Sequence, residues 1–418
     1  MHHFEYRNNE LYCEEIPITE IVRAVGSPFY LYSDATIRQH FRAFDGAFDG
    51  INHLTCFSMK SNSNLAILRL FVLEGSGADI VSGGELYRAL KAGFNPKTIV
   101  YSGVGKMVED LEFGLKSDIL MFNVESTQEI YQLNEVAKKL DKKATVSIRV
   151  NPDVDPQTHP YIATGLKENK FGILIGSALE EYTVAAGLSN LMVSGISCHI
   201  GSQLTDVKPF IEALRSLEEL KKRLEEIGIR IDYLDLGGGL GITYDREEPP
   251  HPKEYAEAIK KELDMEDLTL ILEPGRVIMG NAGILVTKVL YTKSAQGKTF
   301  IVVDAAMNDL IRPSLYGSFH AIQPVKILER KRIKADIVGP ICESSDFFAK
   351  ERDVESFEPG ELMAIMSSGA YGFSMSSNYN SRPRVAEVMV KENQYYIIRK
   401  AEIYEDLIRG EVIPDFLN

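Results

Sequence analysis

The chain has 418 residues, of which 44% are hydrophobic and 25% charged, a composition typical of a soluble globular protein. This length predicts roughly two to three domains. With 46 basic and 60 acidic residues the net charge is −14, so we expect neither nucleic acid nor an anionic membrane as a partner. No apolar run reaches the length of a membrane span, and the opening residues MHHFEYRNNE lack the basic and apolar regions of a signal peptide.

The cysteines narrow the chemistry further. They are scattered along the chain without a CxxC pair, at Cys13, Cys56, Cys198 and Cys342. This distribution argues against a zinc site and against a disulfide framework. We therefore expect no metal and a reducing, cytoplasmic location.

From about residue 28 to residue 280, short apolar strands alternate with amphipathic helices. The candidate strands are residues 53–59, 77–82, 98–102, 119–124, 144–150, 191–200, 231–236 and 268–273. Eight strands with helical crossovers predict an α/β fold, a (β/α)₈ barrel of the TIM type. A doubly wound open sheet is the alternative, because the number of strands does not prove that the sheet closes.

The pattern changes after about residue 283 to short strands with turns and little helix. These strands are expected at residues 283–294, 298–305, 334–341, 361–368 and 386–400. They predict a second, mostly β domain of the sandwich or barrel-like kind. The first 27 residues could pack on it, so we expect a barrel over residues 28–280 and a discontinuous β domain over residues 1–27 and 281–418.

Polar and glycine-rich residues follow several of the expected barrel strands. Lys60 ends the first strand, Asp79 the second and His199 the sixth, whereas Gly237–Gly241 follow the seventh and Glu273–Arg276 the eighth. In such barrels the chemistry gathers at the carboxyl ends of the strands, and phosphate is often held after strands seven and eight. Lys60 is therefore interpreted as a functional residue, although most lysines on turns are ordinary surface residues.

The glycine run after the seventh strand has two readings. A dinucleotide-binding G-x-G-x-x-G motif from Gly237 would need glycine where Ile242 stands, so this motif is absent. A tight turn that needs positive φ is the plain structural alternative. Gly275 makes a second glycine turn after the next strand, and two neighbouring loops with bare backbone amides suit one phosphate group.

A lysine and two glycine loops that could bind a phosphate, all at the carboxyl ends of the barrel strands, suit pyridoxal phosphate as the cofactor. Its aldehyde reacts with a deprotonated lysine amine, and partial burial of Lys60 favours the deprotonated form. Glu273 beside the pyridine nitrogen would keep that nitrogen protonated and strengthen the ring as an electron sink. His199 could stack on the ring or be a hydrogen-bonded histidine of the core.

Several motifs together resemble the fold-type III pyridoxal-phosphate decarboxylases and, more narrowly, the diaminopimelate decarboxylases. They are SMKSN, HIGSQ, DLGGGLGI, EPGR, CESSDFFA and GAYGFSMSSNYNSRPR, and residues 151–173 match as well. The resemblance runs along nearly the whole chain. It implies a barrel with a β domain, an obligate homodimer with shared active sites, and conversion of meso-2,6-diaminopimelate to L-lysine and CO₂, the last step of lysine biosynthesis.

The resemblance also implies roles for individual residues. Lys60 would hold the cofactor, His199 would stack on it, and Cys342, delivered by the partner subunit, would donate a proton. The cofactor would be bound by Lys60, Asp79, His199, Ser202, Gly238, Gly239, Glu273, Pro274, Gly275, Arg276 and Tyr371. The substrate would be bound by Arg276, Arg312, Tyr316, Glu343 and Tyr371. Ser58 and Ser61 stand where the family commonly has alanine, and Ser345 stands where it has glycine. We expect none of these three differences to affect a predicted chemical role.

The residues give weaker, independent support for this substrate. Its second amino-acid centre needs a bidentate cation and a nearby acid, for which Arg312 and Glu343 are candidates, although either could form a plain surface ion pair. The alternatives are an ornithine, arginine or carboxynorspermidine decarboxylase, a racemase and a non-catalytic homologue. Glu273 speaks against a racemase, which tends to place arginine at the ring nitrogen, and the retention of Lys60 and Cys342 speaks against a non-catalytic protein.

Overall fold

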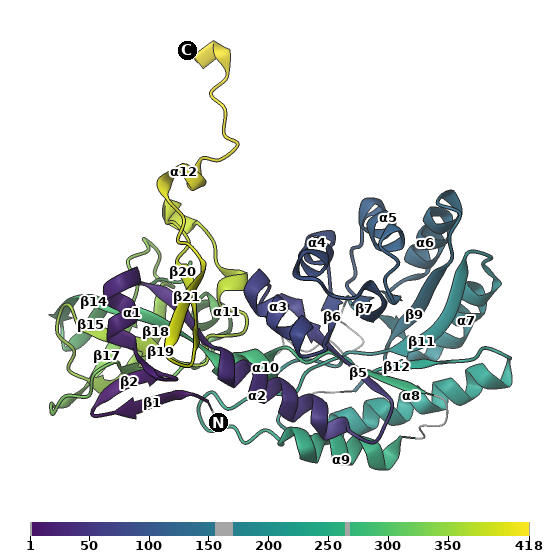
Figure 1. Cartoon of the computed structure of the whole chain (residues 1–418), viewed down its shortest axis with the longest axis horizontal. Coiled ribbons are helices and arrows are strands. Elements are labelled where there is room, and N and C mark those ends of the chain that lie inside the picture. Colours follow the sequence, from purple (N-terminus) through teal and green to yellow (C-terminus); the bar gives the residue numbers. More distant parts are fainter. Residues whose placement is uncertain (1, 155–169, 264–267, 418) are drawn as a thin grey trace. The chain divides into compact units, whose positions relative to one another are not determined.

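A computed structural model describes residues 2–154, 170–263 and 268–417. The chain forms two compact units (Figure 1). The barrel unit comprises residues 38–278, and the β unit joins the residues up to 37 with those from 279 onward. Each unit is described by itself below.

The barrel unit is built on parallel strands that close on themselves. In chain order these strands are β5 (His53–Ser58), β6 (Gly77–Ile80), β7 (Ile99–Tyr101), β8 (Met121–Val124), β9 (Ala144–Asn151), β11 (Leu191–Ser197), β12 (Tyr233–Asp235) and β13 (Thr269–Leu272). Each strand pairs with the next, and β13 pairs with β5 to complete the ring. The barrel prediction is confirmed, and the open sheet is excluded. The short strand β10 (Ile173–Leu174) pairs only with β9 among the described strands.

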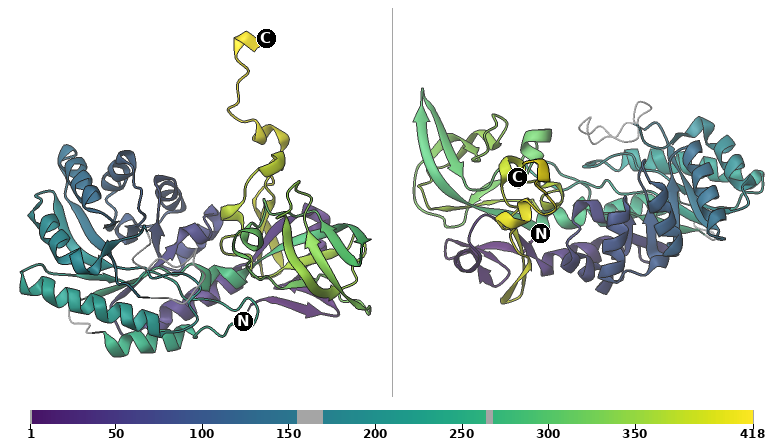
Figure 2. Two further views of the ribbon diagram at one scale, coloured as in Figure 1. Left: turned by 180° about the vertical axis from the view of Figure 1, so that it is seen from behind. Right: turned by 90° about the horizontal axis from the view of Figure 1, so that it is seen from above.

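Helices lie around the outside of these strands (Figure 2). They are α3 (Leu65–Leu73), α4 (Gly83–Ala92), α5 (Val108–Lys116), α6 (Thr127–Lys139), α7 (Ile175–Gly187), α8 (Lys208–Glu226) and α9 (Pro252–Glu262), and α2 (Asp34–Asp45) and α10 (Arg276–Met279) span the boundaries between the units. Side-chain caps fix where several of them begin. Asn64, Ser82 and Ser126 each accept a backbone N–H of the first turn of the helix that follows. These caps set the length of the loops at the carboxyl ends of the strands.

Apolar packing holds the strands and helices of the barrel together. Phe57 of β5 stacks on Phe71 of α3 with 3.8 Å between the ring centroids, and both side chains are fully buried. Inside the barrel, Cys56, Val100 and Met121 form a buried cluster with a residue of β13. Apolar side chains of the strands thus pack both against a helix and inside the barrel.

The β unit contains a twisted sheet and a small N-terminal sheet. The order of the larger sheet is β18 (Phe347–Glu355), β17 (Arg332–Val338), β15 (Lys298–Val303), β14 (Gly283–Ala295), β4 (Phe29–Ser33), β20 (Ala386–Lys391) and β21 (Gln394–Arg399), and β19 (Leu362–Ile365) pairs with both β14 and β16 (Ile322–Pro324). The small sheet has β1 (Phe4–Arg7), β2 (Glu10–Cys13) and β3 (Ile16–Pro17), followed by α1 (Ile18–Val25). The helices α11 (Arg312–Tyr316) and α12 (Tyr404–Leu407) are short.

Residues 28–37, which the sequence assigned to the barrel, lie in the β unit. Strand β4 pairs antiparallel with β14 and parallel with β20, and all five of its residues are buried. A strand that is buried on both faces has the same apolar pattern in a barrel as in a sheet, so the sequence alone did not separate the two. Strand β18 was not expected either, because charged residues such as Lys350 and Glu351 interrupt its apolar pattern.

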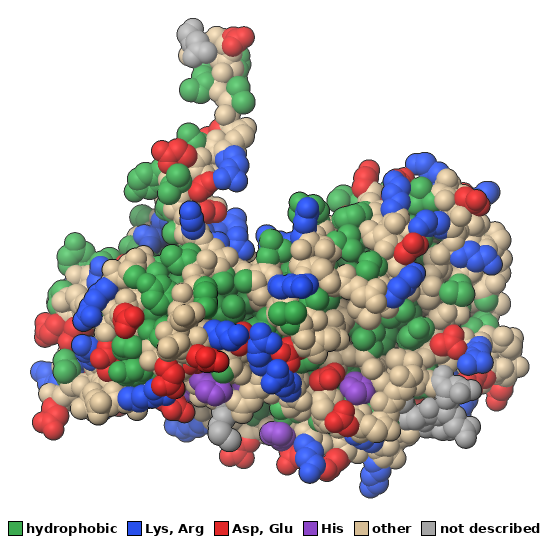
Figure 3. Space-filling model, viewed as in Figure 1, with side chains coloured by type: hydrophobic (Ala, Val, Ile, Leu, Met, Phe, Trp, Pro, Cys, Tyr) green, Lys and Arg blue, Asp and Glu red, His purple; other side chains and the backbone are tan. Residues whose placement is uncertain are grey.

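The visible surface carries a mixture of charges. Figure 3 shows basic and acidic side chains interspersed over this face, with apolar side chains between them. Among the described helices, none is both long enough and apolar enough to span a bilayer.

The stacked pair between β5 and α3 gives a test of the packing. We expect Phe57→Ala to lower the free energy of unfolding of the barrel unit by about 3–5 kcal/mol, because it leaves a cavity against Phe71. Urea unfolding followed by circular dichroism measures the change. Leu73→Ala on the exposed side of α3 is the control and should cost far less. Equal losses in the two variants would show that the ring stack does not stabilise the barrel.

Candidate active site

A cavity of about 420 Å³ lies at the carboxyl ends of the barrel strands. Its lining comes from successive strands and the loops that follow them, and it includes Lys60, Ser102, Asn123, Arg149, Phe171, Ser197, His199, Asp235 and Glu273. Lys60, His199 and Glu273 were expected on this rim. The cavity is of the size and position at which barrel proteins bind small molecules.

Lys60 lies directly after β5, in the short 3₁₀ turn Met59–Ser61. Its Nζ donates to Asp79 Oδ2 at 2.7 Å, and its side chain remains 33% exposed whereas that of Asp79 is fully buried. The Ser58 hydroxyl donates to the same carboxylate oxygen at 2.6 Å. The expectation that Ser58 touches no residue of chemical interest was therefore wrong, because strand β5 points it at the carboxylate that positions the lysine.

Asp235 and Glu273 form the acidic floor of the cavity. Burial raises the pKa of Glu273 well above its usual range, and the charges of Asp235 and Asp79 raise it further. Burial also raises the pKa of Asp235 to about 6, although hydrogen bonds from Gly237 and others oppose the rise. Both side chains line the cavity, and both residues are at most 6% exposed. The floor is therefore short of positive charge.

His199 follows β11 and lines the same cavity. Its Nδ1 accepts the backbone N–H of Gly238 at 3.3 Å. Burial lowers the pKa of this imidazole well below its usual value, and the positive charges of Arg149 and Lys60 lower it further. A neutral ring with one nitrogen already satisfied presents an uncharged flat face, which suits contact with another planar ring.

Glycines in the loops after β12 and β13 approach neighbouring segments closely. A Cβ on Gly238 would lie 2.2 Å from the carbonyl oxygen of Glu273, and one on Gly239, whose φ is +122°, would lie 2.6 Å from that of Gly201. A Cβ on Gly275 would lie 3.1 Å from side-chain atoms of Ser58 and Ser61. Backbone amides without side chains in front of them thus collect at this end of the barrel, as an anion site needs.

Arg276 is held rigidly beside these loops. It is 5% exposed, and its guanidinium donates to Ser202 Oγ at 2.9 Å and to the Tyr244 hydroxyl at 2.6 Å. The structure therefore brings together Ser202, the Gly238–Gly239 turn and the Glu273–Arg276 turn, which the sequence analysis had grouped. Tyr244 was missed, since a single tyrosine in a loop carries no motif.

Arg149 and its partner Glu125 were also missed by sequence reasoning. The Arg149 guanidinium donates to Glu125 Oε1 at 3.0 Å and lies over the ring of Phe171 at 4.8 Å. Glu125 accepts two more N–H groups at 3.0 Å each, from Gly103 and Gly172. One buried carboxylate thus ties together three segments that line the cavity. One signal could have found such residues: they are polar and stand at or near the carboxyl ends of apolar strands. This is true of Arg149, Asn123 and Asp235.

The remaining predicted site residues belong to the β unit. Arg312, 5% exposed, donates to Ser318 Oγ at 3.2 Å and to His320 Nε2 at 3.5 Å, and its guanidinium lies 5.9 Å from the ring centroid of Tyr316. Arg312 and Tyr316 are therefore neighbours, as the pairing in the sequence analysis requires.

Cys342 and Glu343 are adjacent in a loop of the β unit. Cys342 is exposed, and its backbone N–H donates to Asn380 Oδ1 at 2.9 Å. Glu343 Oε2 accepts a hydrogen bond from the Tyr379 hydroxyl at 3.3 Å. Tyr371 has a positive φ of +55°, a backbone conformation that is strained for a residue other than glycine. Residues 155–169 of the matching segment 151–173 lie outside the described residues.

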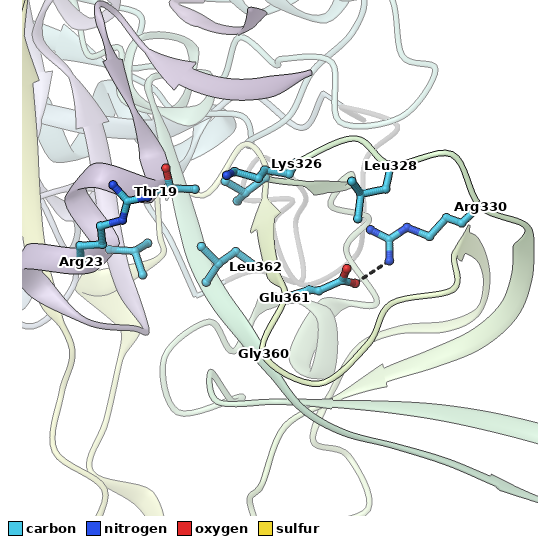
Figure 4. Close-up of a pocket in the computed structure, with 10 residues that line it drawn as sticks. Thr19, Arg23, Lys326, Leu328, Arg330, Gly360, Glu361 and Leu362 are labelled. Atoms are coloured by element: carbon cyan, nitrogen blue, oxygen red, sulfur yellow. Dashed lines mark hydrogen bonds and ion pairs between the residues drawn. The ribbon is translucent and has the colours of Figure 1, made fainter. Parts of the chain in front are cut away.

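A second cavity, of about 320 Å³, lies in the β unit between α1 and the turn before β19 (Figure 4). Aliphatic and charged residues both line it, with Val22 and Leu362 among the former and Arg23 and Lys326 among the latter. Arg330 at its edge is already paired with Glu355 at 3.0 Å and with Glu361 at 2.5 Å. We base no function on this cavity.

The Glu125 cluster generates a stability prediction. We expect Glu125→Gln to lower the free energy of unfolding by about 3–5 kcal/mol, because it leaves the buried Arg149 without its counter-charge. Urea titration measures this loss. The control is Glu112→Gln, which removes a partly exposed carboxylate that pairs with the exposed Lys116 and Lys139 and should change stability far less. If the two variants were equally stable, the cluster would not hold the cavity loops together.

Comparison with known proteins identifies the family. Residues 34–280 match the family model "Pyridoxal-dependent decarboxylase, pyridoxal binding domain". The chain is 51% identical to a diaminopimelate decarboxylase of Aquifex aeolicus over 407 residues, which cover 97% of this chain and 96% of the relative. It is 49% identical over 409 residues to that of Haemophilus influenzae, covering 97% and 98%.

Solved structures give the same result. The diaminopimelate decarboxylase of Helicobacter pylori complexed with L-lysine superposes with a TM-score of 0.91 and 46% identity, covering 94% of this chain and 99% of that one. The enzyme from M. jannaschii, also in complex with L-lysine, gives a TM-score of 0.94 with 38% identity over 99% of each chain. The chain therefore belongs to the diaminopimelate decarboxylases within the pyridoxal-dependent decarboxylase family.

Proposed function

We propose that this chain binds pyridoxal 5′-phosphate in the barrel cavity and decarboxylates meso-2,6-diaminopimelate to L-lysine and CO₂. The observation that carries the proposal is the set of groups in one cavity. The Lys60 amine lies 2.7 Å from a buried carboxylate, a buried carboxyl pair forms the floor, and glycine turns with open amides stand at the edge. These are the groups that an aldehyde, a pyridine nitrogen and a phosphate need.

Unsatisfied polar atoms of the cavity support the fit of this cofactor. Among the described residues, Asn123 Oδ1 and Ser197 Oγ are buried without a hydrogen-bond partner, and both residues line the cavity. A polar, planar ligand offers groups that would satisfy such atoms, whereas an apolar ligand would leave them unpaired. The volume of about 420 Å³ lies in the range of ordinary small-molecule sites.

The residues divide between holding the cofactor and holding the substrate. Lys60 would carry the cofactor, His199 would face its ring, and Glu273 its pyridine nitrogen, with Asp79 fixing the position of Lys60. The phosphate would be bound by Ser202, Gly238, Gly239, the Pro274–Gly275–Arg276 turn and Tyr371. When bound, the cofactor supplies an electron-withdrawing ring that accepts the electrons left behind by CO₂.

The substrate-binding groups must hold one end of the molecule without stabilising the carboxylate that leaves. Arg276, Arg312 and Tyr316 would bind the distal carboxylate and Glu343 the distal ammonium, and Tyr371 would also contact the substrate. Binding at the distal end positions the substrate and leaves the reacting carboxylate in surroundings that do not oppose its loss. The Cys342 thiol would then donate the proton that replaces CO₂ on the carbon.

We further propose that the working form is a homodimer in which Cys342 comes from the partner subunit. The C-terminal segment, residues 400–417, supports the proposal of a second chain, because it extends away from the sheet of its own unit (Figure 1). Its apolar side chains are largely exposed, with Tyr404 at 76%, Val412 at 83% and Phe416 at 83%. Apolar surface of this extent on one short segment is normally covered by another chain.

Release of CO₂ from a panel of amino acids tests the activity. We expect release from meso-diaminopimelate and far less from ornithine, arginine or lysine. Arg312→Ala should lower kcat/KM for diaminopimelate by an amount that corresponds to about 2–5 kcal/mol, because the charge pair with the distal carboxylate is lost. The same change should affect the reaction of lysine much less, because lysine lacks the distal carboxylate. Arg332→Ala, an exposed arginine of β17, is the control. Equal losses for both substrates would place Arg312 at the reacting end or in the fold alone.

Mixing inactive variants tests the shared site. Lys60→Ala removes the cofactor anchor in the barrel, and Cys342→Ala removes the proton donor in the β unit. If each site uses both chains, the mixture should regain part of the activity after subunit exchange. A mixture of Lys60→Ala with Glu273→Gln is the control, because both changes are in the barrel and no intact site can form. Failure of the first mixture, with exchange shown by labelled subunits, would place Cys342 in the site of its own chain or outside any site.

A further inference from the structure

Two donors share one buried carboxylate oxygen at the end of β5. Asp79 is fully buried, and its Oδ2 accepts the Ser58 hydroxyl at 2.6 Å and the Lys60 amine at 2.7 Å. Its other oxygen, Oδ1, is also buried and accepts no hydrogen bond from the part of the chain that the structure describes. The hydrogen bonding of this carboxylate therefore depends on Ser58 and Lys60 together.

The two donors differ in how firmly they are held. Ser58 is the last residue of β5, and in the parallel pairing of β5 with β6 it is the direct partner of Asp79. Its backbone N–H also donates to the Pro274 carbonyl at 3.0 Å. Lys60 lies beyond the strand in a 3₁₀ turn, and its side chain is 33% exposed on a flexible four-carbon stem. The sheet thus fixes the serine bond, whereas the lysine side chain is free to turn away.

Reaction with an aldehyde takes the Lys60 amine away from Asp79. The ammonium first releases a proton to solvent. Its nitrogen then forms a double bond to the aldehyde carbon, and the aldehyde oxygen leaves as water with the two remaining hydrogens of the amine. The nitrogen no longer carries the hydrogens that it offered to Asp79. A buried carboxylate that loses its cation in this way is costly unless another donor remains.

We propose that the Ser58 hydroxyl keeps the Asp79 carboxylate hydrogen-bonded after Lys60 has left it, and so favours attachment of the cofactor to Lys60. This inference rests on the proposed function, since the aldehyde is that of the cofactor. A hydrogen bond to a charged group is stronger than one between neutral groups, so this one hydroxyl offsets part of the lost ion pair. Ser58 acts through Asp79 and is a positioning residue.

Binding of two ligands to the full chain, freed of cofactor, tests this role. Ser58→Ala should weaken the binding of pyridoxal 5′-phosphate about tenfold or more, the effect of losing a hydrogen bond to a charged group. It should leave the affinity for 4-deoxypyridoxine 5-phosphate nearly unchanged, because this analogue has no aldehyde and leaves Lys60 on Asp79. Calorimetry measures both affinities. Equal losses for the two ligands would overturn the proposal, since Ser58 would then act only by shaping the cavity.

Unfolding of the cofactor-free chain gives a second test, which needs no ligand. Ser58→Ala alone leaves Lys60 as a donor to Asp79, whereas Ser58→Ala combined with Lys60→Ala leaves neither donor. The urea midpoint should therefore fall further when Ser58→Ala is added to Lys60→Ala than when it is made alone. The control is Ser76→Ala, which removes a buried hydroxyl that donates to backbone carbonyls and should cost the same in both backgrounds.

The unaltered chain separates failure of this inference from failure of the proposed function. If it binds pyridoxal 5′-phosphate and Ser58→Ala binds that ligand equally well, the role of Ser58 is overturned and the cofactor site stands. If the unaltered chain binds neither ligand, both are overturned. Equal shifts of the urea midpoint in the two backgrounds would also contradict the role of Ser58. A double variant that does not fold, when each single variant does, is the extreme form of the expected result.

Discussion

An excess of buried acid over buried base governs the barrel cavity. Asp79, Asp235 and Glu273 are at most 6% exposed, and the Lys60 amine donates a hydrogen bond to Asp79. A buried carboxylate costs several kcal/mol unless a proton, a donor or a cation compensates it. The Lys60 amine, the Ser58 hydroxyl and the Asn123 amide compensate part of this charge by donating hydrogen bonds. The proposed cofactor would bring a protonated ring nitrogen, a positive charge that such a cavity favours.

The fold makes this concentration of acid possible by closing the sheet. Pairing of β13 with β5 brings the residues after these strands together, so that a Cβ on Gly275 would meet Ser58 and Ser61. The same closure brings the backbone of Gly238 against the carbonyl of Glu273. An open sheet would leave these strand ends apart, and their acids would be hydrated and ordinary. The glycines therefore serve both the packing of the loops and the exposure of their amides.

Sequence reasoning found what is local and missed what depends on neighbours in space. The barrel strands were predictable because each is a short apolar run followed by a helix, and Lys60 and Glu273 stood out as polar residues at strand ends. Asp235 and Arg149 were not singled out, because one polar residue at the end of an apolar strand gains its meaning only from the strands beside it. Ser58 was dismissed for the same reason, since its bond to Asp79 crosses from β5 to β6. Strand β4 was assigned to the wrong unit because burial on both faces gives no directional pattern.

The central claim is that the cavity holds pyridoxal phosphate on Lys60, and mass spectrometry tests it most directly. Borohydride reduction of the protein with its cofactor should fix the cofactor to the amine that holds it. After digestion, the account predicts the added mass on the peptide that contains Lys60, and its loss in Lys60→Ala with the protein still folded. A stable adduct on any other lysine, or none on a chain that binds the cofactor, would contradict the assignment of the site.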